Sequence, residues 1–425
     1  MKIRLFNARI LTMEENRPLF CGEIHINDEL ITYAGEEPAA LTDWDKEIDC
    51  QGNLLMPGFK NAHTHSGMTL LRSHADDLPL ADWLFNQVFP IEEKLNADDI
   101  YHLTKLAILE YLTSGITAIF EMYMAQETIA AACQEMGMRC VQVGAANNFG
   151  TTPKQVAQFY EKLNNVNPLT SYHLGFHAEY TCSESLLREI AELSKHYKAP
   201  VFTHLCETAD EVKGCIERYA KTPVGYLDYL GIFDYGGGGY HCVHLTEEDL
   251  NIFRAKRLYA VTNPASNLKL ASGIAPISAF LKNYIPVAIG TDGPASNNCL
   301  DMFREMFLVT GLAKVRDNDA AAVPAMEVLK MACVNGAKCM GLNKSTSLAA
   351  GNFADLILLD LNQPNMQPMN NIANNIVYSG SKQNVMMTMI HGRILYEKGE
   401  FLVGDVADIY AKANGIINRV KNQGA

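Results

Sequence analysis

The sequence contains no C-x-x-C pair, although it has 11 cysteines among its 425 residues. The number is odd and the positions are scattered, which is not the pattern of a disulfide framework. Cys133 and Cys140, like Cys206 and Cys215, are spaced as residues within helices or strands are. The class of small disulfide-stapled secreted domains is therefore excluded. We expect a reducing compartment, and the cytoplasm as the location.

The sequence also lacks an apolar run long enough to span a bilayer. Its first residues, Met1–Phe6, include a basic residue but alternate in polarity, as in a strand and unlike a signal peptide. Positive charge is not in excess either, because the formal net charge is −13. That charge repels nucleic acid and anionic membranes, so we expect neither as a partner.

The chain does contain the balance of residues of a folded enzyme, with 48% hydrophobic and 20% charged residues. Length alone favours two or three domains. A large α/β barrel with a smaller appendage fits the length equally well, because barrels are long single domains.

Strand-like and helix-like stretches alternate from Leu54 onward, which is typical of repeated βα units. Thr181 with Glu184, and Thr246 with Asp249, have the spacing of capping boxes at helix starts. The number of strands favours a closed (β/α)₈ TIM barrel over the alternative of a doubly wound open sheet. The predicted strands are Leu54–Ala62, Thr117–Met122, Arg139–Ala145, Tyr172–His177, Val201–Leu205, Tyr240–Leu245, Leu258–Thr262 and Val287–Gly290. The clearest predicted helices are Asp98–Ser114, Ser183–Tyr197 and Thr246–Phe253.

Both ends of the chain show short strands and turns instead. The predicted strands there are Lys2–Phe6, Gly22–Ile26, Glu29–Ala34, Asp355–Leu359, Val385–Ile390 and Arg393–Tyr396. We therefore predict a barrel domain of residues 57–344 beside a small β-sandwich domain built from residues 1–56 and 345–425. Residues from Val406 onward are predicted to form a final helix.

The strongest chemical signal is the segment Pro57–His65, which ends in His63-Thr64-His65. Side chains alternate along a strand, so both imidazoles of this H-x-H lie on one face. Two neutral imidazoles held in this way bind a divalent metal. A coincidental surface or core pair explains H-x-H alone equally well. Its place at the carboxyl end of a barrel strand, where active sites form, favours the metal.

Three further predicted strands end in residues with the same chemistry. His204 and Glu207 end the fifth strand as H-x-x-E, His241 lies on the sixth, and Asp292 follows the eighth. Each has a structural explanation when taken alone: a core histidine, a carboxylate at a helix N-terminus or an N-cap. Their shared position at one end of the barrel favours a single active site. His244 shares the predicted sixth strand with His241 but faces the other way.

Longer motifs resemble the amidohydrolase superfamily, in the branch of the S-adenosylhomocysteine, methylthioadenosine and guanine deaminases and the triazine hydrolases. The resemblance covers nearly the whole chain and is carried by PGFKNAHTH, SGMTLLRSHADDLPLADWL, HAEYTCS, THLCET, HCVHLTEED, GTDGPASNN and Gly351–Asp355. It implies one metal ion, usually Zn²⁺ with Fe²⁺ or Mn²⁺ as alternatives, held by His63, His65, His204 and Asp292. The fourth predicted strand contains no lysine, so the two-metal site bridged by a carboxylated lysine is not expected.

The resemblance also implies Glu207, His241 and Asp292 as catalytic residues. A bound divalent metal lowers the pKa of water to about 7. We expect Asp292 to take the proton of this water and Glu207 to protonate the ring nitrogen beside the attacked carbon. We expect His241 to orient the water and to stabilise the oxygen anion.

The expected reaction is hydrolytic deamination of an adenosine-type nucleoside such as methylthioadenosine or S-adenosylhomocysteine. The alternative within enzymes is a hydrolase of another nitrogen heterocycle: guanine, a pterin or a chlorotriazine. A catalytically silent relative used for assembly is a third hypothesis, against which the complete ligand set argues. We expect a small heterocyclic substrate as partner, and a homo-oligomer, either a dimer or a tetramer.

Substrate contacts are predicted for Trp83, His177, Glu207, Ser296 and Arg72. The indole of Trp83 suits stacking on a planar ring, and packing against the barrel wall is its alternative. Arg72 is predicted to hold an anionic or ribose part, with a surface ion pair as the alternative.

The sequence predicts the purine-like ring of the substrate better than the substituent attached to the ribose, which we call its tail. Arg139, like Arg72, could hold an anionic or ribose part of the substrate or form a surface ion pair. Glu179 takes a position where a small residue is commoner in the similar proteins, and we expect it to add charge to the pocket. The loop Asn147–Pro153 has no arginine to hold a homocysteine carboxylate. The four glycines before Tyr240 predict a softened sixth strand or a close backbone approach.

Overall fold

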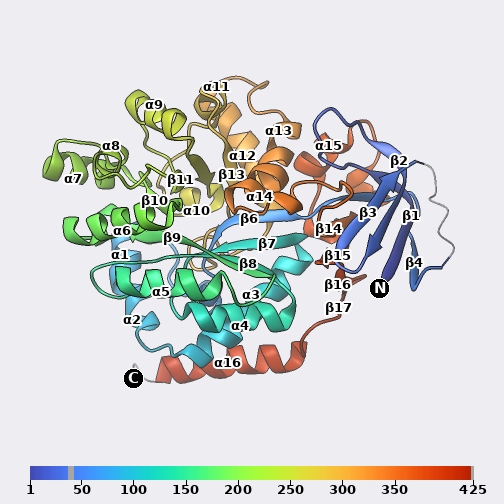
Figure 1. The fold of residues 1–425 in the computed structure, drawn as a ribbon, viewed down its shortest axis with the longest axis horizontal. Helices are drawn as coiled ribbons and strands as arrows, with labels where there is room; N and C mark the ends of the chain where they lie inside the picture. The colour runs from blue at the N-terminus through green and yellow to red at the C-terminus, as the bar shows by residue number, and fades with distance from the viewer. Residues whose placement is uncertain (37–42, 423–425) are drawn as a thin grey trace.

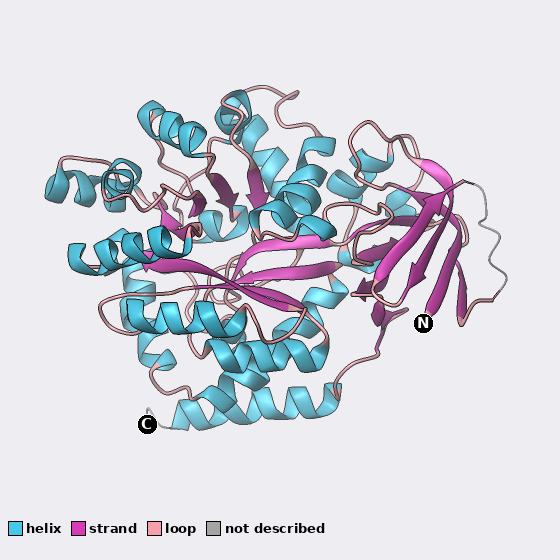
Figure 2. Cartoon of the chain, viewed as in Figure 1, coloured by secondary structure: helices cyan, strands magenta, loops and turns pink. Residues whose placement is uncertain are grey.

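The computed structural model describes residues 1–36 and 43–422. It contains a central sheet surrounded by helices and a second sheet beside it, near the N-terminus (Figure 2). The central sheet has eight strands in the order β13-β12-β11-β10-β9-β8-β7-β6, and all paired neighbours are parallel. These strands are β6 (Phe59–Thr64), β7 (Ile116–Glu121), β8 (Arg139–Val143), β9 (Thr170–Ala178), β10 (Val201–Leu205), β11 (Gly237–His241), β12 (Tyr259–Thr262) and β13 (Val287–Ile289).

The two edge strands of the central sheet meet, so that it closes into a barrel. Just beyond β13, the amide of Asp292 donates a hydrogen bond to the carbonyl of His63 (3.0 Å). The side chain of Asn61 adds two more hydrogen bonds across the seam: its Nδ2 donates to the hydroxyl of Thr291 (2.7 Å), and its Oδ1 accepts from the amide of Thr291 (2.8 Å). Gly290 permits this approach, because a Cβ there would lie 2.7 Å from the Cβ of His63. The predicted TIM barrel is confirmed.

The first predicted strand, Leu54–Ala62, is wrong because it is two strands of two different sheets. β5 (Leu54–Pro57) belongs to the second sheet, and β6 begins after Gly58. Both strands are completely buried, so the apolar run shows no polar break where the chain passes from one sheet to the other.

The sixth strand is β11 and not the predicted Tyr240–Leu245. It ends at His241, because His241 and Cys242 adopt φ angles of +71° and +50° that do not continue a strand. The glycines form its first part and let the neighbouring backbones approach, since a Cβ at Gly237 would lie 1.9 Å from the carbonyl oxygen of Val201. His244 therefore lies beyond the strand, where its Nε2 donates to the carbonyl of Ser272 (2.7 Å).

Helices cover the outside of the barrel (Figure 1). The predicted capping box of Thr246 and Asp249 is present at the start of α9. The one predicted for Thr181 and Glu184 is wrong: Ser183 caps α6, and Thr181 ends a short 3₁₀ turn. The helices are α1 (Leu80–Trp83), α2 (Phe89–Glu92), α3 (Ala97–Thr113), α4 (Gln126–Met136), α5 (Pro153–Leu163), α6 (Glu184–Tyr197), α7 (Ala209–Tyr219), α8 (Pro223–Tyr229), α9 (Glu247–Lys256), α10 (Pro264–Lys269), α11 (Ile277–Lys282), α12 (Met302–Asp317), α13 (Ala325–Lys330), α14 (Gly336–Cys339), α15 (Ile372–Asn374) and α16 (Val406–Asn422).

The second sheet is mixed and has nine strands from both ends of the chain. Its order is β17-β16-β15-β14-β5-β1-β2-β3, with β4 paired to β1. The strands are β1 (Lys2–Ile10), β2 (Phe20–Asn27), β3 (Leu30–Gly35), β4 (Lys46–Asp49), β5, β14 (Leu356–Leu359), β15 (Val385–Ile390), β16 (Arg393–Glu397) and β17 (Glu400–Phe401). We keep the division into residues 1–56 with 345–425 and residues 57–344 as a proposal. The predicted final helix, α16, packs on α3 of the barrel, where Ile416 and Val420 join Leu103 in one buried cluster.

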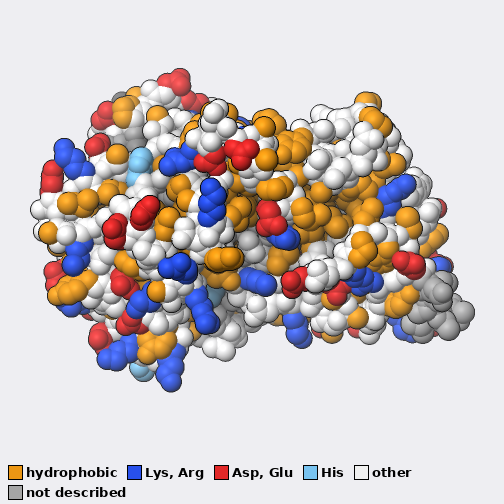
Figure 3. Space-filling view, turned by 90° about the horizontal axis from the view of Figure 1, so that it is seen from above, with side chains coloured by type: hydrophobic (Ala, Val, Ile, Leu, Met, Phe, Trp, Pro, Cys, Tyr) orange, Lys and Arg blue, Asp and Glu red, His pale blue; other side chains and the backbone are white. Residues whose placement is uncertain are grey.

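The surface carries charges of both signs side by side, as the face in Figure 3 shows. On that face hydrophobic side chains gather towards the middle, on the side where α11, α12 and α13 lie in Figure 1. Among the residues that the structure describes, no helix combines the length and the apolar character needed to cross a membrane.

Candidate active site

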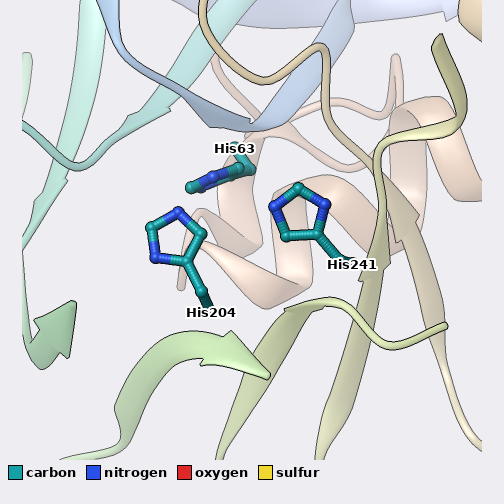
Figure 4. Close-up of side chains that lie close together, drawn as sticks. All are labelled: His63, His204 and His241. Carbon is teal, nitrogen blue, oxygen red and sulfur yellow. The ribbon is translucent and has the colours of Figure 1, made fainter. Parts of the chain in front are cut away.

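The predicted site residues meet at the carboxyl end of the barrel. His63 lies in β6, His204 in β10 and His241 at the end of β11, and their rings converge on one space (Figure 4). One ring nitrogen from each of these three lies within 4.8 Å of the others. A ring nitrogen from each of His63 and His65 and a carboxylate oxygen of Asp292 lie equally close together. The two groups share His63, so the structure brings the four predicted metal ligands and His241 together.

His63 occupies the centre of this cluster and is completely buried. Neither of its ring nitrogens has a hydrogen-bond partner among the described residues, and Oδ1 of Asp292 lies 3.5 Å from Nε2. Burial lowers the pKa of His63 to about 3, so the ring is neutral. The ring of Tyr240 stacks on it at a centroid distance of 3.8 Å. A buried, neutral imidazole without a partner is costly unless an ion completes it, and this fits a metal ligand.

The other histidines are oriented through Nδ1. In His204 this atom donates to the carbonyl of His177 (2.7 Å), and in His65 it donates to the carbonyl of Met122. In His241 it faces Oδ1 of Asn267 at 2.8 Å. Each bond fixes the ring through Nδ1, so Nε2 is the ring atom that can bind an ion or a water molecule, as metal-binding histidines require.

Asp292 follows β13 in a left-handed conformation (φ +59°) that turns its carboxylate towards the histidines. Its Oδ1 lies 3.1 Å from Nε2 of His65, while Oδ2 accepts hydrogen bonds from Ser266 (2.6 Å) and Ser296 (2.7 Å). Burial favours the protonated acid, but the imidazoles of His63 and His65 hold the pKa of Asp292 well below its usual value. The group is therefore an anion suited to a cation.

Glu207 lies beside the histidines and is also buried. Its Oε2 is 3.8 Å from Nε2 of His241, and its Oε1 accepts a hydrogen bond from Ser272 (3.2 Å). Burial is the main reason why the pKa of Glu207 is raised above its usual value. A carboxyl group with a raised pKa can give and take a proton near neutral pH.

The segment after β12 supports three site residues, although no site residue was predicted there. Ser266 contacts Asp292, Asn267 contacts His241 and Ser272 contacts Glu207. Neither periodicity nor a short motif marks these residues in the sequence. Only the barrel geometry brings this segment against the ends of three other strands.

Glu211 is a second buried carboxylate that the sequence did not reveal. It accepts hydrogen bonds from the backbone amides of Cys206 (2.7 Å) and Glu207 (2.8 Å). Cys206 has φ +53°, an uncommon conformation for a residue with a side chain. Glu211 thus holds the turn that carries Glu207, and burial raises its pKa to about 7.

Two further buried carboxylates near His65 were also missed. Glu121 ends β7 and accepts hydrogen bonds from the amide and the hydroxyl of Ser66. Glu92, in α2, accepts one from the hydroxyl of Tyr123 (2.6 Å). Burial raises the pKa of both glutamates to about 7, and the charge of His65 opposes this rise. Glu121 had a signal, as an acid at the end of an apolar strand.

The structure places the predicted substrate residues in different surroundings. Trp83 is buried in the main hydrophobic core, which is compatible with the alternative that it packs against the barrel wall. The ring of His177 is 4.8 Å from that of His204, between centroids. The hydroxyl of Ser296 is bonded to Asp292. Arg72 pairs with the carboxylate of Glu110 and donates to the carbonyl of Asn298, so its charge is already partnered.

Comparisons with known proteins agree with this geometry. Residues 54–395 match the model of the amidohydrolase family. The chain is 37% identical to a 5-methylthioadenosine/S-adenosylhomocysteine deaminase of Thermoanaerobacter pseudethanolicus, over 99% of this chain and 100% of that protein. It is 30% identical to a zinc-bound adenosine deaminase from Xanthomonas campestris, with a TM-score of 0.93 over 99% of this chain and 98% of that one. The zinc complex of an atrazine chlorohydrolase from Arthrobacter aurescens has the same fold (TM-score 0.90, 20% identity, 98% of this chain and 100% of that one).

The family match covers far more than half of the chain, and the match to the relative from Thermoanaerobacter covers 99% of it. The ligand set of His63, His65, His204 and Asp292 suits one divalent metal ion. This chain belongs to the amidohydrolase family.

Proposed function

We propose that this enzyme hydrolytically deaminates an adenosine-type nucleoside, with Zn²⁺ held by His63, His65, His204 and Asp292. The observation that carries the proposal is the buried His63 among these ligands, which finds no hydrogen-bond partner in the described part of the chain, beside a carboxyl group of raised pKa. Similarity over the full chain to proteins named as deaminases of such nucleosides supports the substrate class. The 11 cysteines, all free thiols, support a cytoplasmic location as part of the same proposal.

The chain's own residues supply the proton transfers. When bound, a divalent ion acts as a Lewis acid that lowers the pKa of water. Asp292 is ionised, so that it accepts a proton from the attacking water. Glu207, whose pKa burial raises above its usual value, is the carboxyl group placed to give a proton to the ring nitrogen of the substrate. Nδ1 of His241 is held by Asn267, so a neutral His241 presents Nε2 as an acceptor that orients the water.

The charges around the barrel mouth favour a substrate with an uncharged tail. A homocysteine carboxylate needs a cation, because a carboxylate that loses its water without one is strongly disfavoured. Three cations on the segments after the barrel strands are already paired with acids: Arg72 with Glu110, Arg218 with Glu179, and Lys269 with Asp76. Glu179 itself is buried and its carboxylate is paired with Arg218, so it does not add an unpaired negative charge. We therefore propose methylthioadenosine-like nucleosides over S-adenosylhomocysteine.

Ammonia release from the zinc-loaded enzyme tests both parts of the proposal. We expect turnover of methylthioadenosine, with a kcat/KM at least about tenfold above that for S-adenosylhomocysteine. Equal rates for the two would refute only the preference for an uncharged tail. Turnover of guanine, a pterin or a chlorotriazine instead of nucleosides would refute the proposed substrate class. A protein that binds no zinc by elemental analysis would refute the metal site itself.

A further inference from the structure

Inside the barrel, the aromatic ring of Tyr240 lies against the ring of His63. The two ring centroids are 3.8 Å apart and the ring planes are inclined by 20°, so the rings are stacked face to face. The same tyrosine meets the ring of His204 closer to edge-on, at 5.7 Å and 67°. Tyr240 belongs to the cluster of buried side chains that fills the barrel. It therefore contacts two of the four proposed metal ligands from the inside of the barrel.

His63 differs from the other histidines of the site in how its ring is held. Nδ1 of His65, His204 and His241 each has a polar partner at hydrogen-bond distance. No residue that the structure describes gives Nδ1 of His63 such a partner. The rings of the other three histidines also meet His63 edge-on. Metal-binding histidines usually have their ring plane fixed through the second nitrogen, whereas here the stacked ring of Tyr240 defines that plane.

The hydroxyl group of Tyr240 does not explain why a tyrosine occupies this position. It is buried and has no hydrogen-bond partner among the groups that the structure covers. A buried polar group without a partner is destabilising, so the hydroxyl lowers the stability of the fold. The ring is therefore the part of Tyr240 that the site can use.

Neighbouring side chains hold the ring of Tyr240 in place. Phe202 lies two residues before His204 on β10, so the two side chains share one face of the strand. The ring of Phe202 is nearly parallel to that of Tyr240 (20°, 6.2 Å between centroids), and Phe120 meets Tyr240 edge-on at 5.9 Å. Gly238 leaves room for Phe202, because a Cβ at Gly238 would lie only 3.1 Å from Cε1 of the phenyl ring. The glycines before Tyr240 thus allow a layer of aromatic rings next to the site.

We propose that Tyr240 is a positioning residue of the metal site, whose ring fixes the imidazole plane of His63 in place of a hydrogen bond to Nδ1. This inference rests on the metal site of the proposed function. Stacked aromatic pairs are favourable beyond the area that they bury. Without a flat ring at this position the imidazole is free to turn. Ordering it then becomes part of the cost of binding the ion, so the ion is held more weakly.

The zinc affinity of three variants tests the proposal. Zinc-loaded protein is equilibrated with a chromophoric chelator, which gives the Kd for zinc. Tyr240→Leu removes the flat ring and is expected to raise this Kd about tenfold, as the loss of a residue that orients a ligand does. Tyr240→Phe removes only the hydroxyl, so its Kd should match that of the unmodified protein, and its free energy of unfolding should be equal or higher.

Phe120→Leu is the matched control, because it removes a ring from the same buried cluster. This ring packs on Tyr240 and His173, neither of which is a proposed metal ligand. The control should lose stability much as Tyr240→Leu does but keep the Kd for zinc. Tyr240→Met fills more of the space without a flat ring, and should weaken zinc binding as Tyr240→Leu does even if the leucine variant does not fold.

The Kd values of these proteins separate a positioning role from a structural one. A raised Kd in the leucine and methionine variants, with a normal Kd in Tyr240→Phe and Phe120→Leu, supports the proposal. An unchanged Kd in both variants without the ring would overturn it. So would an equal rise in Phe120→Leu, because affinity would then follow stability, or in Tyr240→Phe, because the hydroxyl would then be the group that matters. An unmodified protein that binds no zinc would refute the proposed metal site and this inference with it.

Discussion

At the amino end of the barrel, Arg139 and Asp355 form a buried pair whose polar atoms are all engaged. Arg139 binds both oxygens of Asp355, at 2.8 and 3.1 Å. Asp355 also accepts hydrogen bonds from Ser345 (2.6 Å) and from the amide of His391 (2.8 Å). At the carboxyl end, buried groups of similar polarity surround His63, whose ring nitrogens have no hydrogen-bond partner within residues 1–36 and 43–422.

The comparison of the two ends distinguishes buried polar residues that stabilise the fold from buried polar residues that are available for chemistry. Buried polar groups in folded proteins are nearly always hydrogen-bonded, so an unpartnered one requires an explanation. Arg139, which the sequence offered as a candidate substrate contact, has its explanation in Asp355 and joins the barrel to the second sheet. An ion at the proposed metal site would give His63 the partner that the described residues do not supply. The same residue types thus serve stability at one end and reactivity at the other.

The largest effect is expected when one of the proposed metal ligands at the carboxyl end of the barrel is removed. Asp292→Ala should reduce kcat/KM for the nucleoside on the order of 10³-fold or more, because the stabilisation from a bound metal amounts to several kcal/mol. Zinc content, measured by elemental analysis, should fall with activity. Ser296→Ala is the matched control: it removes one hydrogen bond to Asp292 and should cost only about 10- to 100-fold. Equal losses in the two variants would contradict the ligand assignment.

At the amino end, a substitution of similar severity should spare catalysis. Arg139→Met leaves Asp355 buried without its cation, which is expected to lower the free energy of unfolding by about 3–5 kcal/mol. Chemical denaturation measures this loss, and kcat per folded, zinc-loaded molecule should stay unchanged. The double variant Arg139→Met, Asp355→Leu should recover much of the stability. A fall in kcat without a fall in stability would place Arg139 in the active site after all.

At the carboxyl end of the barrel, the Glu207→Gln variant tests proton transfer without removing a proposed metal ligand. The amide cannot carry the proton, so kcat should fall about 10²- to 10⁴-fold, while zinc content and the free energy of unfolding stay close to those of the unmodified enzyme. Steady-state kinetics with zinc analysis on one sample measures both. A variant with nearly normal kcat would show that another group moves the proton.

The sequence predicted the polar side chains at the carboxyl ends of the strands better than it predicted the strand boundaries. His63, His204 and Asp292 were found because an apolar strand that ends in a metal-binding side chain has a recognisable pattern. The boundary at Gly58 was missed, since β5 and β6 are both buried and read as one apolar run. The start of β11 was missed for the opposite reason, because glycines carry no apolar signal.

Supporting residues were the hardest to predict. Ser266, Asn267 and Glu211 act through contacts with residues that are distant in sequence or on another turn. Serine, asparagine and glutamate are common in loops and helices, so their presence carries no information without the fold. For Trp83 the structure shows burial in the main hydrophobic core, and the predicted stacking on the substrate ring stays a prediction.

Lowering the pH should remove the contribution of the Arg139–Asp355 pair to the free energy of unfolding. Arg139 lowers the pKa of Asp355 to about 2 against the opposing effect of burial, whereas an unfolded aspartate has a pKa of about 3.9. The folded pKa is depressed, so the stabilisation is present above about pH 4 and is lost as the pH falls towards 2. It amounts to roughly 2–3 kcal/mol. Denaturation of metal-free protein at pH 5 and pH 2.5 should show this loss, and Asp355→Asn should abolish it. An equal acid dependence in the variant would contradict the assignment.

The smallest effect is expected from the turn that carries Glu207. Glu211→Gln keeps one acceptor for the two amides of Cys206 and Glu207 but turns a donor towards the other, which costs about 1–3 kcal/mol when it is buried. The turn should loosen and displace Glu207, so we expect kcat to fall about tenfold with KM and zinc content nearly unchanged. A positioning role also predicts a shift in the pH–kcat profile, because the surroundings of the Glu207 carboxyl group change. Lower stability with an unmoved profile would mean that Glu211 only holds the backbone together and has no influence on the proton that Glu207 transfers.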